Sequence, residues 1–134
     1  MSKIRQLMAL LITVAGVVSV HAKGPTIADL EKLIGRQNES LPRLIAPDVR
    51  QEKVSVSGLT LINKYTMLSA TRNQLMKSNF ENVQRRDTTS SVCKDPFTSR
   101  ILRDGVSFRY MHYDKDSFLG SDFTVSLRDC ATVR

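Results

Sequence analysis

The sequence predicts a single α+β domain in which helices cover one face of a four-stranded, mainly antiparallel sheet, in the order α-ββ-α(α)-ββ. Two observations lead to this prediction. Apolar residues recur every three to four positions in two parts of the chain, as in helices, and every second position in four shorter parts, as in half-buried strands. The chain also has only 134 residues, of which 41% are hydrophobic and 25% charged, which is enough for one core. This size excludes large multidomain enzymes.

The first element is predicted to be a helix. From Pro25 onwards apolar residues recur at three- and four-residue steps, and Gly35 is expected to end the helix. The next segment, residues 38–47, contains Pro42 and Pro47. Because proline interrupts regular structure, we expect a packed connector or a short second helical turn there.

Two β-hairpins are predicted from the alternating segments. Alternation after Val49 and again from Leu59 to Met67 indicates two strands that reverse at Gly58, where glycine supplies the backbone freedom of a tight turn. Residues 106–113 and 122–128 show the same alternation, and the polar residues between them, 114–117, form the second reversal.

The segment between the hairpins, residues 70–104, has a helical period and is expected to contain a break. The break is placed either in the polar run 87–91 or at Asp95-Pro96. At the second position Asp95 would cap a new helix and Pro96 would occupy its first position. Gly105 is expected to end the helical segment.

Cys93 and Cys130 are the only cysteines, and an isolated pair in an exported protein normally forms a disulfide. We therefore predict a Cys93–Cys130 bridge that fastens the helical layer to the end of the sheet. The cysteines are 37 positions apart, for which the chain-entropy model gives a stabilisation of roughly 4 kcal/mol. The alternative, a reactive thiol, would require an unpaired cysteine beside a histidine.

Residues 1–22 have the pattern of a secretory signal peptide. Two basic residues precede an apolar stretch over residues 7–20, and Ala22 is the small residue after which we expect cleavage. A membrane anchor is the alternative, but the apolar stretch is shorter than the roughly 20 residues that span a bilayer. We expect residues 23–134 to form a periplasmic or secreted domain without a transmembrane segment.

The mature chain would be modestly basic. The formal charge of the whole sequence is +7, and loss of the two basic residues of the leader would leave +5. Such a surface favours acidic partners, and it disfavours an inhibitor of a strongly basic enzyme such as lysozyme, because like charges slow encounter. The alternative is that the charges are scattered over solvated faces, since no run of four basic residues occurs.

His112 is the only histidine of the mature chain, and the alternation of its strand places it among the inward-facing residues. A hydrolase triad would have to use it, yet no serine lies in a Gly-x-Ser-x-Gly turn. Asp114, Asp116 and Asp122 lack the glycine and the closing glutamate of a calcium loop. We therefore predict no catalytic residue, no cofactor-binding residue and no metal ligand.

A basic surface with tyrosines for stacking is the candidate binding site, suited to a glycan or another polyanion. Its predicted residues are Arg85, Arg86, Arg109, Tyr110 and Tyr113, with Arg100, Arg103 and Arg128 as further basic positions. The alternative is that these side chains belong to ordinary solvated faces of helices and strands.

Several short motifs between Leu41 and Cys130 resemble a family of small exported bacterial proteins of unassigned chemistry. They are Leu41-Pro42, Asp48-Val49-Arg50, Tyr65-Thr66-Met67-Leu68, Val92-Cys93, the stretch from Gly105 to Tyr110, and Cys130. The chain departs from that family at Asn63, where a second aromatic residue is expected, and at Ser117, where a glycine is usual. Some members are associated with virulence or secretion, and the resemblance supplies no catalytic residue.

The resemblance and the motifs together favour a non-enzymatic periplasmic or secreted protein of the bacterial envelope that binds another envelope component, and the resemblance implies an association with virulence. The expected partner is an envelope protein or a polyanionic glycan, with no specific nucleic acid. One alternative is an accessory factor of a secretion machine, similar in outline to the pilotins, although the chain lacks their lipidation cysteine. A second alternative is a small envelope hydrolase that uses His112. Oligomeric state is not predicted.

Overall fold

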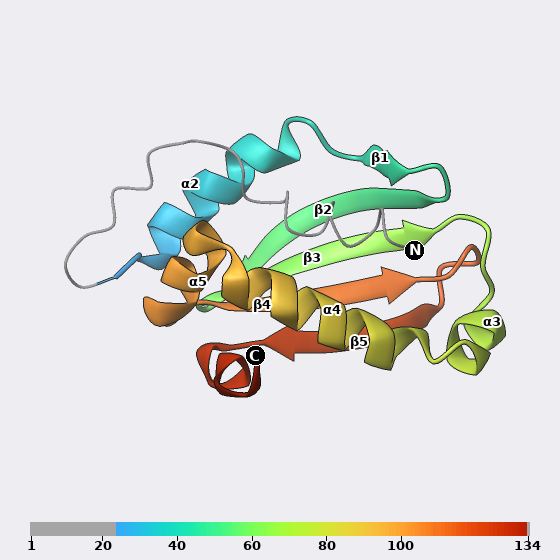
Figure 1. The fold of residues 1–134 in the computed structure, drawn as a ribbon. Coiled ribbons are helices and arrows are strands. Elements are labelled where there is room, and N and C mark those ends of the chain that lie inside the picture. Colours follow the sequence, from blue (N-terminus) through green and yellow to red (C-terminus); the bar gives the residue numbers. More distant parts are fainter. Residues whose placement is uncertain (1–23, 134) are drawn as a thin grey trace.

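The computed structural model describes residues 24–133. The predicted signal peptide and its cleavage point lie outside the described residues. Within residues 24–133 no helix has the length and apolar character needed to cross a membrane. Figure 1 shows an α+β arrangement, and this predicted class is confirmed.

Five strands form one sheet, and the helices precede or connect them. The elements are α2 (Ile27–Asn38), β1 (Arg43–Ala46), β2 (Val49–Ser57), β3 (Thr60–Met67), α3 (Arg72–Lys77), α4 (Phe80–Lys94), α5 (Pro96–Arg103), β4 (Ser107–Tyr113), β5 (Leu119–Val125) and the short 3-10 helix η2 (Leu127–Thr132). The strand order is β1-β2-β3-β4-β5.

The predicted number of strands was wrong, because the sheet has five strands rather than four and is mixed. The additional strand, β1, lies in the segment expected to be a connector or a helical turn, and it pairs antiparallel with the start of β2. Pro42 and Pro47 flank it, which suits a short edge strand because proline cannot donate a ladder hydrogen bond. β3 and β4 run parallel, since the three helices between them carry the chain back to the same end of the sheet.

The sequence predicted that the first helix ends at Gly35, but α2 continues to Asn38. The Asn38 amide donates to the carbonyl oxygen of Val54 at 2.8 Å, and its Oδ1 accepts from the Val54 N–H at 2.9 Å. Both backbone groups belong to a part of β2 that has no β1 partner. The contact between Asn38 and Val54, and not Gly35, therefore marks the end of α2.

The helical segment breaks at Asp95-Pro96, one of the two predicted positions, and α4 runs uninterrupted through residues 87–91. The Asp95 carboxylate accepts from the Thr98 N–H at 2.8 Å and so caps α5. A further break, not predicted, lies at Asn79, whose φ of 57° separates α3 from α4.

The last strand ends at Val125, so the prediction that it continues to residue 128 was wrong. Residues 127–132 instead form η2. The Asp129 carboxylate accepts from the backbone N–H and the hydroxyl of Ser126, at 2.7 and 3.0 Å. This local capping ends the strand, and the alternating pattern of apolar residues does not reveal it.

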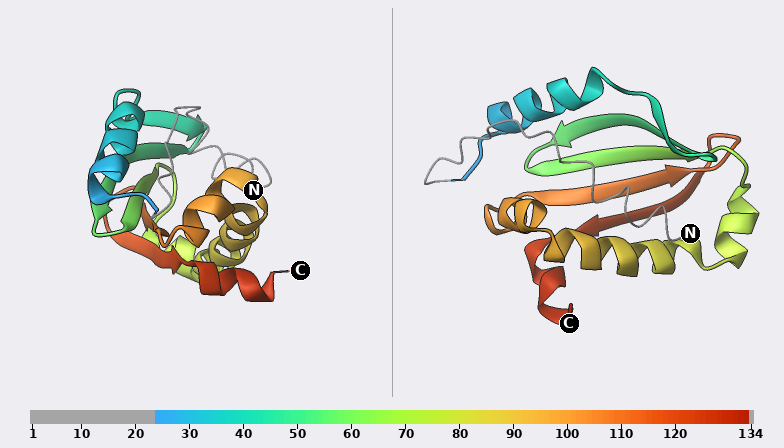
Figure 2. Two further views of the ribbon diagram at one scale, coloured as in Figure 1. Left: turned by 90° about the vertical axis from the view of Figure 1, so that its left-hand side faces the viewer. Right: turned by 45° about the horizontal axis from the view of Figure 1, so that its top comes forward.

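The core lies on one face of the sheet. Alternate residues of β3 and β4 are buried, among them Leu61, Tyr65, Phe108 and Tyr110, and the helices cover that face. The left view of Figure 2 shows a curved sheet with α4 and α5 inside the curve, whereas α2 follows the β2 edge. The opposite face of the strands carries half-buried polar side chains and is called the open face below.

The structure contains the predicted Cys93–Cys130 disulfide. Cys93 lies in α4 and Cys130 in η2, directly after the last strand, with their Cα atoms 5.5 Å apart. The bridge therefore joins the helical layer to the end of the sheet, as the sequence predicted.

Candidate binding surface

The structure divides the predicted basic surface between two faces. Arg85 and Arg86 are exposed on α4, whereas Arg109 and Tyr113 lie half-buried on the open face of β4. Tyr110 was wrongly predicted to lie on this surface, because it is only 1% exposed and its ring stacks on Phe123 with 5.5 Å between centroids. The alternation of β4 turns Tyr110 towards the core and Arg109 away from it.

Arg109 is held by a paired carboxylate on the neighbouring strand. Its Nε lies 2.9 Å from Asp122 Oδ1 and its Nη2 lies 2.6 Å from Asp122 Oδ2, a two-pronged contact that fixes the guanidinium in one plane. The hydrogen bonds from Arg109 hold the pKa of Asp122 below its usual range against the opposing effect of partial burial. Much of the charge of Arg109 is therefore balanced within the fold.

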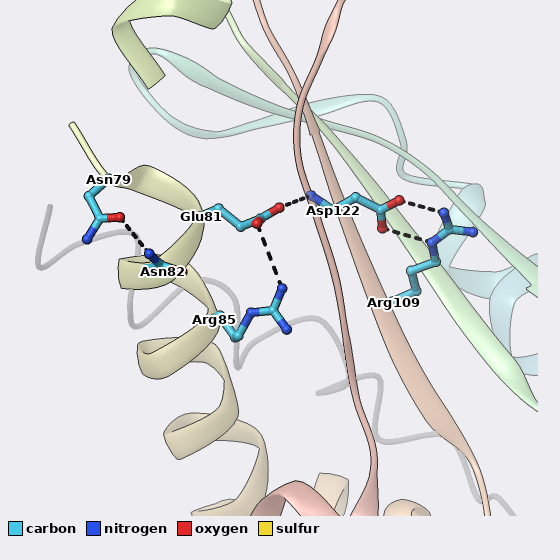
Figure 3. A network of polar contacts seen from close by, with 6 residues as sticks. All are labelled: Asn79, Glu81, Asn82, Arg85, Arg109 and Asp122. Carbon is cyan, nitrogen blue, oxygen red and sulfur yellow. Dashed lines mark hydrogen bonds and ion pairs between the residues drawn. The ribbon is translucent and has the colours of Figure 1, made fainter. Parts of the chain in front are cut away.

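Glu81 connects this pair to α4, as Figure 3 shows. Its Oε1 accepts from the backbone N–H of Asp122 at 2.8 Å, and its Oε2 lies 3.8 Å from Nη2 of Arg85. β5 is the last strand of the sheet, so Glu81 satisfies a backbone donor that would otherwise be available to another chain. The two arginines thus stand on either side of the β5 edge, each beside a carboxylate.

Two hollows meet at Arg85 and Thr124, and together we call them the Arg85 groove. The first, of about 530 Å³, lies on the open face and is lined by Arg85 and Arg109 with Ser57, Thr60 and Thr124 among its walls. The second, of about 430 Å³, lies between α4 and η2, and Arg86, Thr89 and Ser90 contribute to it. The groove therefore runs from the open face around the β5 edge to the helical side.

The groove is rich in hydrogen-bonding groups and only moderately cationic. Its hydroxyl groups and guanidinium groups suit a ligand that carries hydroxyl, carboxylate or sulfate groups. Arg109 is paired with Asp122, and Arg86 Nε lies 3.3 Å from Asp87 Oδ1. The guanidinium carbon of Arg85 lies 5.6 Å from the centre of the Phe123 ring, which helps to hold the side chain over the strand.

His112 lies outside this groove and deep in the core. It is 0% exposed, its ring stacks on Tyr65 at 5.1 Å, and neither ring nitrogen has a hydrogen-bond partner among residues 24–133. Burial lowers the pKa of His112 to about 3. This geometry lacks the serine and aspartate contacts that the hydrolase alternative requires. In the described part of the chain, no three His, Cys, Asp or Glu side chains are grouped so that they could hold a metal ion.

Sequence reasoning missed Glu81 and the pairing of Asp122 with Arg109. The first had a detectable signal, since Glu81 and Arg85 are four residues apart on a predicted helix. The second had none, because Arg109 lies opposite Thr124 and reaches Asp122 diagonally, a relation fixed only by the register of β4 and β5.

Solved structures share this fold at low sequence identity. A protein from Pseudomonas aeruginosa described as a "putative secreted protein" has a TM-score of 0.65 at 22% identity over 75% of this chain and 88% of its own. The type 2 secretion system pilotin EpsS of Vibrio vulnificus gives 0.53 at 16% identity, and the type II secretion system pilotin AspS of Vibrio cholerae gives 0.55 at 15%. Each pilotin match covers 96% of both chains.

No curated protein is significantly similar in sequence. A family model, however, matches residues 26–124, which span α2 and all five strands almost to the end of β5. The sequence resemblance to small exported, virulence-associated proteins is thereby confirmed. The chain belongs to the family described as "Putative quorum-sensing-regulated virulence factor".

Proposed function

We propose that this protein is an exported, non-enzymatic binding protein of the bacterial envelope, and that the Arg85 groove recognises its partner. The proposal rests on one observation: two hollows meet at Arg85, beside the β5 edge. At this edge Glu81 already accepts a hydrogen bond from the backbone N–H of Asp122. Membership of a virulence-factor family and a fold shared with a secreted protein support an extracytoplasmic role.

The chemistry of the groove favours an anionic partner rich in hydroxyl groups, such as a polyanionic envelope glycan. Guanidinium groups pair with carboxylate or sulfate groups, and the threonine and serine side chains can bond to neighbouring hydroxyls. Arg109 makes two short hydrogen bonds to Asp122, and Arg86 lies 3.3 Å from Asp87. Arg85 makes only a 3.8 Å contact with Glu81, so it is the groove arginine whose charge is least tightly paired.

Heparin, used as a polyanion probe, tests this proposal by calorimetric titration at low and at physiological salt. We expect binding that weakens with salt, and a loss of affinity of about five-fold or more in Arg85→Ala, since one charge-assisted contact contributes on the order of 1 kcal/mol or more. Arg100→Ala is the matched control, because Arg100 is exposed on α5 and does not line the groove. Equal losses of affinity in both variants would show that binding depends only on net charge. Absence of heparin binding at low salt would rule out a polyanionic partner.

A second candidate is an accessory role in a secretion machine, which the likeness of fold to two pilotins favours. Crosslinking in envelope extracts, with the disulfide-bonded protein as bait and Arg85→Ala as a comparison, distinguishes it. Recovery of one component of a secretion system with the wild-type protein and not with the variant would favour the accessory role through the same groove. Recovery of glycan alone would favour the first candidate.

A further inference from the structure

The short 3-10 helix η2 forms one wall of the Arg85 groove, yet none of its residues is fully buried. Asp129 and Thr132, with Val133 directly after them, line the hollow of about 430 Å³ that η2 shares with α4. Leu127, the largest apolar side chain of η2, is 48% exposed. Figure 2 shows η2, in red, projecting beyond the end of β5. Because burial of apolar side chains is what holds a short helix on a fold, packing anchors η2 only weakly.

The hydrogen bonds of η2 are local. The Asp129 carboxylate accepts from the backbone N–H and the hydroxyl of Ser126, and the Thr132 hydroxyl donates to the Asp129 carbonyl oxygen at 3.2 Å. These bonds shape η2 but do not join it to α4. The link to α4 is covalent, since Cys130 of η2 is bonded to Cys93 of α4. The bridge therefore determines where the η2 wall of the groove stands.

The α4 wall of the groove is held by other contacts. Phe80 and Val92, near the two ends of α4, are buried against the core. Glu81 accepts a hydrogen bond from the backbone N–H of Asp122 at 2.8 Å and so ties α4 to β5. If the bridge opens, Arg85 and the hollow on the open face should therefore keep their positions, and only the η2 wall should move.

The bridge lies where another thiol can approach it, because Cys93 and Cys130 are both half-buried rather than enclosed. A protein dithiol would open it by thiol–disulfide exchange. One thiolate of the dithiol attacks a sulfur of the bridge, and its second thiol then resolves the mixed disulfide. Two electrons and two protons pass to Cys93 and Cys130, which become thiols, and the dithiol leaves as a disulfide.

We propose that the Cys93–Cys130 bridge controls the Arg85 groove as a redox switch. The closed bridge fixes the η2 wall and so completes the second hollow, whereas reduction by a dithiol releases this wall and lowers the affinity for a polyanionic partner. A partner of the reduced protein would have to order η2 on binding, and this ordering costs part of the binding free energy. The inference rests on the proposed function, since it concerns the regulation of the same groove.

Calorimetric titration with heparin compares three forms of the protein: bridged, reduced with dithiothreitol, and Cys93→Ser/Cys130→Ser. We expect the reduced protein and the double variant to bind heparin about five-fold or more weakly than the bridged protein. The double variant separates loss of the bridge from any effect of the reductant. Amide spectra of the ¹⁵N-labelled protein should show unchanged signals for β3 and β4 in all three forms, and changed signals for residues 127–133.

Two variants, one in each hollow, show which wall responds to the bridge. Ser90 lines the hollow beside η2, and Thr60 lines the hollow on the open face. Ser90→Ala should weaken heparin binding about two-fold or more in the bridged protein and have no further effect in the reduced protein. Thr60→Ala is the matched control, because it removes a hydroxyl group from the other hollow and should weaken binding by the same factor in both redox states.

Equal affinity of the bridged and the reduced protein for heparin would overturn the inference, as would an equal effect of Ser90→Ala in both redox states. Loss of the β3 and β4 signals on reduction would also overturn it, because the bridge would then hold the whole fold rather than one wall. In each of these cases, heparin binding by the bridged protein would still support the Arg85 groove. If the bridged protein does not bind heparin at low salt, the proposed function fails, and its regulation fails with it.

Discussion

Replacement of His112 by phenylalanine measures how much a buried polar row destabilises this sheet. Gln51, Tyr65, His112 and Ser121 lie directly opposite one another on four neighbouring strands. Each is at most 2% exposed, and each has a buried polar atom without a hydrogen-bond partner among the described residues. His112 contributes two such atoms, so it is the position where an apolar side chain should have the largest effect.

At neutral pH the expected effect is stabilisation. A buried polar atom without a hydrogen bond costs roughly 1–3 kcal/mol, so loss of the two ring nitrogens should raise the free energy of unfolding by about 2 kcal/mol at pH 7.5. The phenyl ring can keep the aromatic contacts of the imidazole, which stacks on Tyr65 at 5.1 Å and on Phe123 at 6.2 Å. The larger ring reduces the gain by whatever it costs to accommodate its extra volume.

At acidic pH the difference should grow. Burial lowers the pKa of His112 to about 3 in the folded protein, whereas a histidine in an unfolded chain has a pKa of about 6.5. As the pH falls below about 6.5, the unfolded state binds a proton that the folded state does not, so the wild type loses up to about 1.4 kcal/mol per pH unit. Between pH 7.5 and 4.5 the variant should therefore gain about 2.5 kcal/mol more over the wild type.

Urea unfolding followed by far-ultraviolet circular dichroism across this pH range provides the measurement. Tyr65→Phe is the matched control, because it removes an unpartnered buried hydroxyl of the same row and keeps the imidazole. It should raise stability by about 1 kcal/mol at every pH without changing the pH dependence. Parallel stability curves for the wild type and His112→Phe, or a wild type more stable than the variant at pH 7.5, would refute the reasoning.

Three further changes test the covalent and local determinants of the fold. Joint replacement of Cys93 and Cys130 by serine should lower the free energy of unfolding by up to about 4 kcal/mol in urea titrations, whereas an unchanged midpoint would contradict the role of the bridge as a clasp. Backbone N–H groups outweigh burial and hold the pKa of Asp114 below its usual range. Asp114→Asn should therefore lower the melting temperature by several degrees at pH 7, and this deficit should shrink as the pH falls below about 4, because the unfolded wild-type chain then binds a proton that the folded carboxylate binds only at lower pH. Ser117 has a φ of 67°, in the left-handed region, so Ser117→Gly should raise the free energy of unfolding by about 0.5–1 kcal/mol, and a destabilised variant would show that the turn does not need glycine freedom.

Features that depend on neighbours along the chain could be predicted from the sequence. The alternation in β3 and β4 placed Leu61, Tyr65 and Phe108 in the core, and Asp95-Pro96 was recognised as a possible helix start. The departure noted at Ser117 also has a physical meaning, because the usual glycine of the related family would suit the positive φ found there.

Features that depend on distant segments of the chain could not be predicted from the sequence. β1 has only four residues and a weak pattern, and its pairing with β2 makes it a strand. Arg109 and Asp122 are both present in the sequence, but only the register between β4 and β5 brings the two side chains together. Tyr110 is not such a case, because the alternation of β4 already places it on the core face together with Phe108.

The sequence by itself determined the α+β class, the two reversals at Gly58 and at residues 114–117, and the cysteine pair, because local periodicity and turn chemistry act over a few residues. Only the tertiary structure decided the parallel pairing of β3 with β4 and the two hollows that meet at Arg85. These features arise where helices and strands far apart in the chain pack together, and the free energy of that packing depends on three-dimensional contacts that no sequence spacing encodes.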